Sequence, residues 1–105
     1  MIGDKILKII IETSLLTKEE IVTASKMVET AGADFIKTST GFSIAGATVE
    51  NIHLIQNSVG PGTMIKASGG IKSFNQVQAL LDAGANRIGT GSSVKIMEEI
   101  PIELT

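Results

Sequence analysis

Two lysines end two similar apolar segments of this 105-residue chain. Lys37 closes one segment and Lys66 the other, and small, hydroxyl-bearing and glycine residues follow both: Thr38-Ser39-Thr40-Gly41 and Ala67-Ser68-Gly69-Gly70. An apolar run of this length followed by glycine is typical of a buried strand that ends in a loop. Burial disfavours the charged form of lysine, and a lysine that loses its proton near neutral pH is a nucleophile towards carbonyl carbon. The pattern therefore indicates Schiff-base chemistry.

The presence of two such lysines, and not one, favours a functional role. Neighbouring strands lie about 4.8 Å apart, so amines at matched positions repel each other, and the repulsion lowers the pKa of at least one of them. A single lysine at a strand end is more often salt-bridged, or has a buried stem and a hydrated head. Two lysines at matched positions favour the functional interpretation, although their spacing does not decide which is the nucleophile.

Glycines and serines near two later strand ends predict a phosphate site. Gly69 and Gly70 follow one strand, and the next strand ends in Gly89-Thr90-Gly91-Ser92-Ser93. Glycines let backbone N–H groups approach a ligand, and a helix that begins at Ser92 or Ser93 directs its positive dipole end to the same place. The alternative interpretation of a glycine pair is an ordinary tight turn.

Other candidate groups are few. Glu12 ends the first predicted strand and could exchange a proton with the amines, although a salt bridge is its more ordinary role. His53 falls inside a predicted helix and is expected to be a surface or packing residue. One histidine, no cysteine and scattered carboxylates give no metal-ligand spacing, so neither a metal nor another cofactor is expected.

The composition limits the class of protein. With 43% hydrophobic and 19% charged residues, residues 1–105 can form one domain with a real core. A net charge of −2 and only three aromatic residues argue against nucleic acid and anionic membrane as partners. Charges near the start interrupt any signal-peptide core, and no run of about 18 apolar residues predicts a membrane span. We expect a cytoplasmic protein.

Strand and helix patterns alternate along the whole chain. Apolar, β-branched runs predict strands at 6–13, 34–39, 63–68 and 86–91. Helices are predicted to begin at Thr17, which forms a capping box with Glu20, at Thr48, at Ser73, with a second box to Gln76, and at Ser92 or Ser93. Glycines end the first three helices, and Pro101 ends the last.

Four consecutive βα units predict an α/β fold with a parallel sheet. The segment 31–41 resembles 83–93, 52 positions later, as expected of a duplicated barrel. A closed barrel of eight units needs about 200 residues or more, so this chain is predicted to form half of a TIM barrel. An open half exposes two strand edges and an apolar concave face, which a partner must cover unless the chain forms an open α/β layer.

Several segments closely resemble deoxyribose-phosphate aldolase. They are Ile9-Ile10-Ile11-Glu12-Thr13, the stretch 31–42, Ile65-Lys66-Ala67-Ser68-Gly69-Gly70-Ile71 and Ala85-Asn86-Arg87-Ile88-Gly89-Thr90. The resemblance covers about residues 6 to 95, and the two lysine motifs in this order are highly specific. It corresponds to the C-terminal half of that family's barrel.

The resemblance implies a metal-free class I aldolase that cleaves 2-deoxy-D-ribose 5-phosphate to acetaldehyde and D-glyceraldehyde 3-phosphate. It implies that Lys37 forms the Schiff base and that Lys66 lowers its pKa and relays protons. The residues that match the family's phosphate-binding region or lie beside it are Thr40, Gly41, Gly69, Gly70, Gly91, Ser92 and Ser93.

One departure from the family pattern concerns an aspartate. The family takes this member of its proton relay from the first half of the barrel, and no position here matches it. A positioned proton-transfer group typically contributes about 10²–10⁴-fold to rate. Imine formation could therefore survive in this chain while turnover falls.

Three hypotheses follow. The first is an aldolase half-barrel that works as a homodimer or beside a complementary N-terminal half chain. The second is a catalytically incomplete half-barrel that only self-associates or binds sugar phosphate. The third, a phosphate-binding module from another barrel family, predicts binding that does not depend on Lys37.

Overall fold

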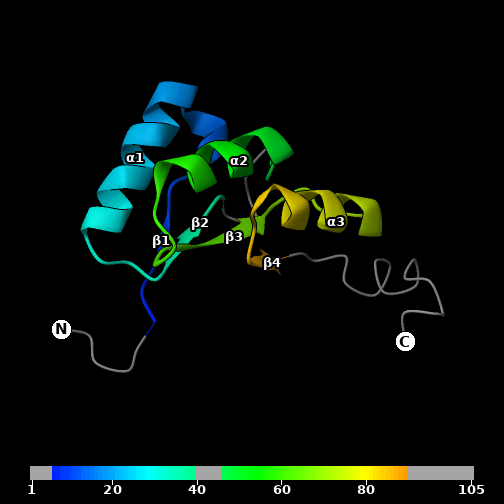
Figure 1. Cartoon of the computed structure of the whole chain (residues 1–105). Helices are drawn as coiled ribbons and strands as arrows, with labels where there is room; N and C mark the ends of the chain where they lie inside the picture. The colour runs from blue at the N-terminus through cyan, green and yellow to red at the C-terminus, as the bar shows by residue number, and fades with distance from the viewer. Residues whose placement is uncertain (1–5, 40–45, 90–105) are drawn as a thin grey trace.

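The computed structural model describes residues 6–39 and 46–89, which form alternating strands and helices (Figure 1). The predicted last helix and residues 40–45 lie outside the described residues. In chain order the elements are β1 (Lys8–Ile10), the 3₁₀ turn η1 (Thr13–Leu15), α1 (Lys18–Thr30), β2 (Phe35–Lys37), α2 (Val49–Ser58), β3 (Met64–Ser68), α3 (Phe74–Ala83) and β4 (Arg87–Gly89).

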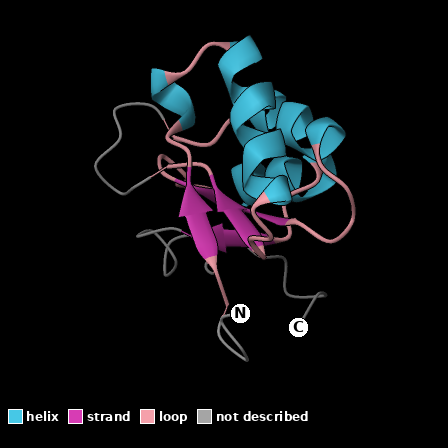
Figure 2. Ribbon diagram, turned by 90° about the vertical axis from the view of Figure 1, so that its left-hand side faces the viewer, coloured by secondary structure: helices cyan, strands magenta, loops and turns pink. Residues whose placement is uncertain are grey.

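The four strands form one parallel sheet in the order β1-β2-β3-β4. Each strand therefore lies beside the next one in sequence. The three α-helices lie together on one side of this sheet (Figure 2), with α1 packed against α2 and α2 against α3. A doubly wound sheet carries helices on both faces, whereas a barrel carries them only outside. The predicted half of a TIM barrel is confirmed, and the open-layer alternative is not favoured.

The helix starts follow the predicted caps. The Thr17 hydroxyl accepts from the Glu20 N–H at 3.1 Å, and Glu20 accepts from the Thr17 N–H at 2.8 Å, which completes the predicted box. The second predicted box is wrong in one half. The Ser73 hydroxyl caps α3 by accepting from the Gln76 N–H. The Gln76 side chain, however, accepts from the backbone N–H of Lys72, the residue before Ser73.

The two copies of the internal repeat form matching turns between a helix and the next strand. After α1, Gly32 takes φ 80°, and after α3, Gly84 takes φ 124°, backbone conformations that favour glycine. Asp34 then accepts from the Leu7 N–H at 2.9 Å through its side chain. Asn86 does the same for the Ile65 N–H at 2.9 Å. Each copy of the repeat thus ends a helix and joins the next strand to the preceding one.

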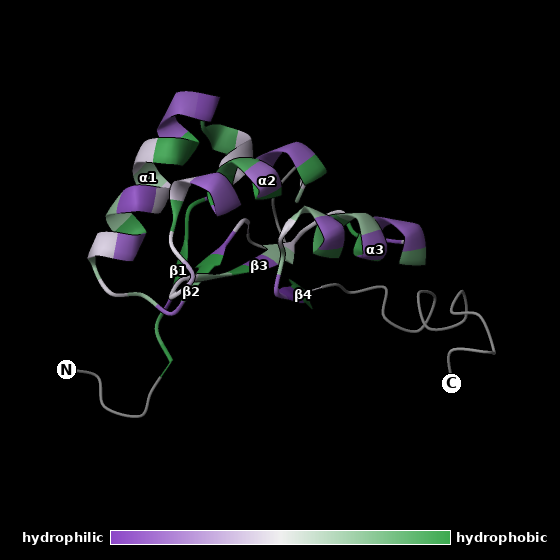
Figure 3. Ribbon diagram, viewed as in Figure 1, coloured by the Kyte–Doolittle hydropathy of each residue, from purple (hydrophilic) through white to green (hydrophobic). Residues whose placement is uncertain are grey.

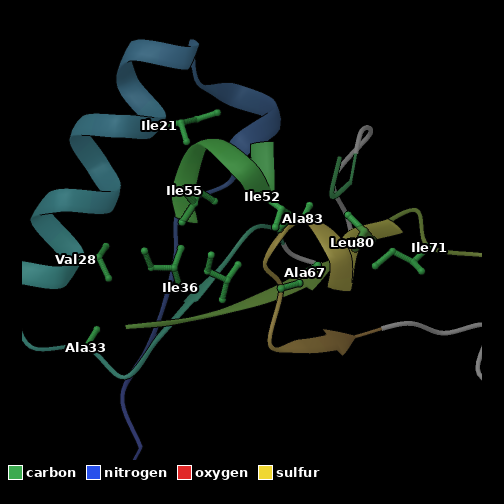
Figure 4. Close-up of a cluster of buried hydrophobic side chains, with 12 residues drawn as sticks. Ile21, Val28, Ala33, Ile36, Ile52, Ile55, Ala67, Ile71, Leu80 and Ala83 are labelled. Atoms are coloured by element: carbon green, nitrogen blue, oxygen red, sulfur yellow. The ribbon is translucent and has the colours of Figure 1, made fainter. Parts of the chain in front are cut away.

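The hydrophobic core lies between the helices and one face of the sheet. Hydrophobic and hydrophilic residues alternate along the helices (Figure 3), and the buried side chains gather on the sheet side of them (Figure 4). The strands contribute the fully buried Ile36 and Ala67 to this core, and α2 contributes the fully buried Ile52 and Ile55. Leu81, an apolar residue of α3, is exposed. Within the described segments, no helix combines the length and the apolar composition that a membrane crossing requires.

Candidate active site

Lys37 and Lys66 lie directly opposite each other on β2 and β3. Their neighbours Ile36 and Ile65 are buried in the core beneath the helices. Because successive side chains of a strand point to opposite faces, both lysines lie on the face turned away from the helices. The matched position inferred from the two motifs is therefore present in the folded chain.

The electrostatic prediction is confirmed for Lys66. Desolvation by burial lowers the pKa of Lys66, and the positive charges of Lys8, Lys37 and Arg87 lower it further, in that order. Repulsion between the two motif lysines thus contributes, as predicted. Burial and the charge of Lys8, which the two-motif argument did not include, both contribute more.

Lys8 and Arg87 are functional candidates that sequence reasoning missed. The Nζ atom of Lys8 lies 5.8 Å from the centroid of the Phe35 ring, and Cζ of Arg87 lies 4.8 Å from it. Phe35 is only 1% exposed although it lies on the face away from the helices. Two cations against one ring are cation–π contacts, and they hold both charges near the lysine pair. The internal repeat offered a signal, because Arg87 occupies the place of Phe35 in the second copy.

Buried hydroxyls join the ends of β2 and β3 just beyond the lysines. The Thr38 hydroxyl accepts from the Ser68 N–H at 3.1 Å, and the Ser39 hydroxyl donates to the Ser68 carbonyl at 2.6 Å. The Ser68 hydroxyl donates to the Ser39 carbonyl at 2.6 Å. All three side chains are buried. Satisfied buried polar groups of this kind hold the two strand ends in a fixed relation.

The predicted phosphate-binding glycines are partly described. Gly69 and Gly70 follow β3 with φ 89° and 68°, so both need glycine's conformational freedom. A Cβ on Gly46 would overlap the carbonyl of Gly69, and the Ala47 N–H donates to the Ser68 and Gly69 carbonyls at 3.0 and 3.1 Å. Gly46 was missed in the sequence because it follows no strand pattern. Five other predicted site residues lie outside the described residues: Thr40, Gly41, Gly91, Ser92 and Ser93.

His53 and Glu12 are the two weaker candidates from the sequence. His53 is exposed on α2, in agreement with its predicted surface role. Glu12 has φ 51°, a left-handed conformation that is uncommon for a residue other than glycine, and it directly precedes η1. Across 6–39 and 46–89, no three histidine, aspartate or glutamate side chains come together as metal ligands.

No family model matches the chain. It is 54% identical over 101 residues to the deoxyribose-phosphate aldolase of Coprothermobacter proteolyticus, a match that covers 96% of this chain and 46% of that protein. A solved structure of a putative deoxyribose-phosphate aldolase from Coccidioides immitis matches with TM-score 0.86 and 44% identity, over 93% of this chain and 40% of the other. A deoxyribose phosphate aldolase from Aeropyrum pernix, described as tetrameric, matches with TM-score 0.80 and 35% identity, over 89% and 40%.

The agreement extends through both sequence and fold. Identity of about half, over more than nine-tenths of this chain, accompanies close superposition on aldolase structures. The chain spans less than half the length of the relatives it matches, as a half-barrel would. This chain is therefore a homologue of the deoxyribose-phosphate aldolases over about half of their length.

Proposed function

We propose that this chain carries the Schiff-base half of a class I aldolase. Its substrate is 2-deoxy-D-ribose 5-phosphate, and its products are acetaldehyde and D-glyceraldehyde 3-phosphate. Lys37 forms the imine with the substrate carbonyl. The observation that carries the proposal is the direct pairing of Lys37 with Lys66 on one face of the sheet, in a homologue of aldolases.

Lys66 acts beside the imine as the proton carrier. Because its pKa is lowered by burial and by neighbouring cations, a larger share of this amine is neutral near physiological pH than for a lysine in water. A neutral amine can accept a proton, and the ammonium that results can return it. The amine of Lys37, which forms the imine, attacks a carbonyl carbon only in its neutral form.

The phosphate end of the substrate is assigned to the loops at the carboxyl ends of the strands. The positive φ angles of Gly69 and Gly70 suit a loop whose backbone N–H groups turn towards an anion. The other residues assigned to this role are Thr40, Gly41, Gly91, Ser92 and Ser93. A cytoplasmic location belongs to the same proposal, because the substrate is a charged sugar phosphate.

A partner covers the face that carries the lysines. Ile10 and Met64 on this face are 43% and 37% exposed, and residues of this kind are normally covered in a barrel. Either a second copy of this chain or a complementary half chain fills that role. The partner is also where the missing acid of the proton relay has to come from.

Reductive trapping tests the imine assignment. The chain is incubated with acetaldehyde at pH 7 and treated with borohydride, and peptide mass then locates N-ethyl-lysine. Lys37 is expected to be modified far more than the exposed Lys26 and Lys72, which serve as internal references for unassisted alkylation. A Lys37→Met variant should lose the selective adduct.

Two outcomes would contradict this assignment. Modification of Lys66 in place of Lys37 would exchange their roles, and modification no greater than that of the reference lysines would remove Schiff-base chemistry. If trapping succeeds without cleavage of the sugar phosphate at any protein concentration, the alternative of a catalytically incomplete half-barrel holds. A stable monomer in a measurement of solution mass would contradict self-association.

A further inference from the structure

Gly89, the last residue of β4, lies beside the far end of the Lys66 side chain. The strand register pairs Lys66 with Arg87 and Ser68 with Gly89. A Cβ built on Gly89 would lie 3.0 Å from Cε of Lys66 and 3.7 Å from its Nζ. The backbone of Lys66 lies opposite Arg87, but its side chain extends along the sheet as far as Gly89, two residues further along β4. Gly89 has no side chain.

Backbone conformation does not explain a glycine at this position. Among the described residues, the glycines with positive φ are Gly32, Gly69, Gly70 and Gly84, and Gly89 is not one of them. Any residue could therefore adopt its backbone. What a larger residue would lack is space, since a Cβ contact of 3.0 Å is closer than ordinary van der Waals packing allows.

We propose that Gly89 is a positioning residue, whose missing side chain leaves the space in which the Lys66 amine is held next to Lys37. The placement follows from the contacts alone, and its catalytic consequence rests on the proposed function. A Cβ at this position pushes the end of Lys66 away from β4. Lys37 and its charge lie on the other side, on β2, so the amine moves outward into water.

The displacement has a definite electrostatic sign. Desolvation is the largest cause that lowers the pKa of Lys66. An amine that moves into water regains its hydration, so Gly89→Ala should raise the pKa of Lys66 towards that of a free lysine. The fold should tolerate the change, because the crowded atoms belong to the flexible end of a long side chain.

Competitive acylation measures this effect directly. The folded chain is treated with a small excess of acetic anhydride at pH 8, and peptide mass gives the rate at Lys66 relative to exposed Lys26. Only the neutral amine reacts, so a rise of the pKa slows the reaction. We expect Gly89→Ala to slow acylation of Lys66 at least about two-fold. Gly62→Ala is the matched control, because a Cβ there meets nothing within 4 Å and should leave the rate unchanged.

A double-mutant cycle separates placement from general packing. Lys66→Ala removes Cε and Nζ, two of the three atoms nearest to a Cβ at position 89, and leaves the third, the Cβ of Ser68, at an ordinary contact distance of 3.4 Å. Any loss of stability on Gly89→Ala, measured by chemical denaturation, should therefore largely disappear in the Lys66→Ala background. If Gly89→Ala alone prevents folding, the double variant should fold.

The proposal is overturned by an unchanged acylation rate at Lys66 in a folded Gly89→Ala chain. It is equally overturned if the stability loss persists in full without the lysine, or if the double variant fails to fold. These measurements involve no substrate or imine. The trapping experiment can therefore fail while Gly89 is shown to position Lys66, and the reverse can also occur.

Discussion

The two faces of the sheet follow different rules, although their residues alternate along the same strands. The face under the helices carries Ile36, Ile65 and Ala67, all buried and apolar. The opposite face carries four cations, Lys8, Lys37, Lys66 and Arg87. Two of them, Lys8 and Arg87, lie against the Phe35 ring. Burial of apolar area stabilises the first face, whereas clustered like charges oppose folding on the second. The charged face therefore costs stability, as expected of a face that carries the proposed Schiff-base site.

The largest difference in stability between the two faces is expected for adjacent residues on β2. Ile36→Ala should lower the free energy of unfolding by about 2–5 kcal/mol, because it leaves a cavity in the core. Lys37→Met should change it by less than about 1 kcal/mol, because it removes like-charge repulsion and keeps the apolar stem. Chemical denaturation measures both values. A Lys37→Met loss as large as that of Ile36→Ala would show that both faces stabilise the fold.

A smaller effect is expected at the loop edge, where backbone contact replaces side-chain packing. Gly46→Ala should lower the free energy of unfolding by about 1–3 kcal/mol, because its Cβ would overlap the backbone of Gly69. Gly62→Ala, with no atom in the way, should change it by less than about 0.5 kcal/mol. Equal values for the two variants would mean that residues 46 and 69 are not in contact in solution.

The charged face can be weakened without disturbing the core. Lys8→Met and Arg87→Met should each raise the pKa of Lys66, since each removes a positive charge that disfavours its ammonium. Lys8→Met should have the larger effect, and added salt should raise the pKa in the parent chain. The pH dependence of acylation at Lys66 reports all three. A lower pKa in either variant would contradict the charge arrangement.

The smallest effect concerns stability against pH. Because the pKa of Lys66 is lower in the folded chain than its ordinary value of 10.5, the unfolded chain binds more protons between the two values. Stability contributed by this residue therefore rises as the pH increases through that interval. Chemical denaturation at several alkaline pH values should show a smaller rise for Lys66→Met than for the parent. An equal rise in both chains would assign the effect to other groups.

The sequence determined the order of the strands and α-helices and the location of the lysine pair. It did not predict η1, which begins at Thr13, within the strand predicted at 6–13. The Thr17–Glu20 box begins α1, the caps Thr48 and Ser73 begin α2 and α3, and the repeat provides the turns before β2 and β4. Local hydrogen bonds and φ restrictions are encoded within a few residues, which is why they can be read from the chain. Residues 90 and 91 of the strand predicted at 86–91, and the helix expected after it, lie outside the described residues.

Only the tertiary structure decided what surrounds the amine. Lys8 is 58 positions from Lys66 and Arg87 is 21 positions from it, yet both charges act on it because parallel pairing places the four strands side by side. The space left by Gly89 and the approach of Gly46 to Gly69 are likewise contacts between distant segments. Spacing along the chain predicts which residues lie at the carboxyl ends of the strands. Distances across the sheet depend on register and packing, and no local pattern specifies them.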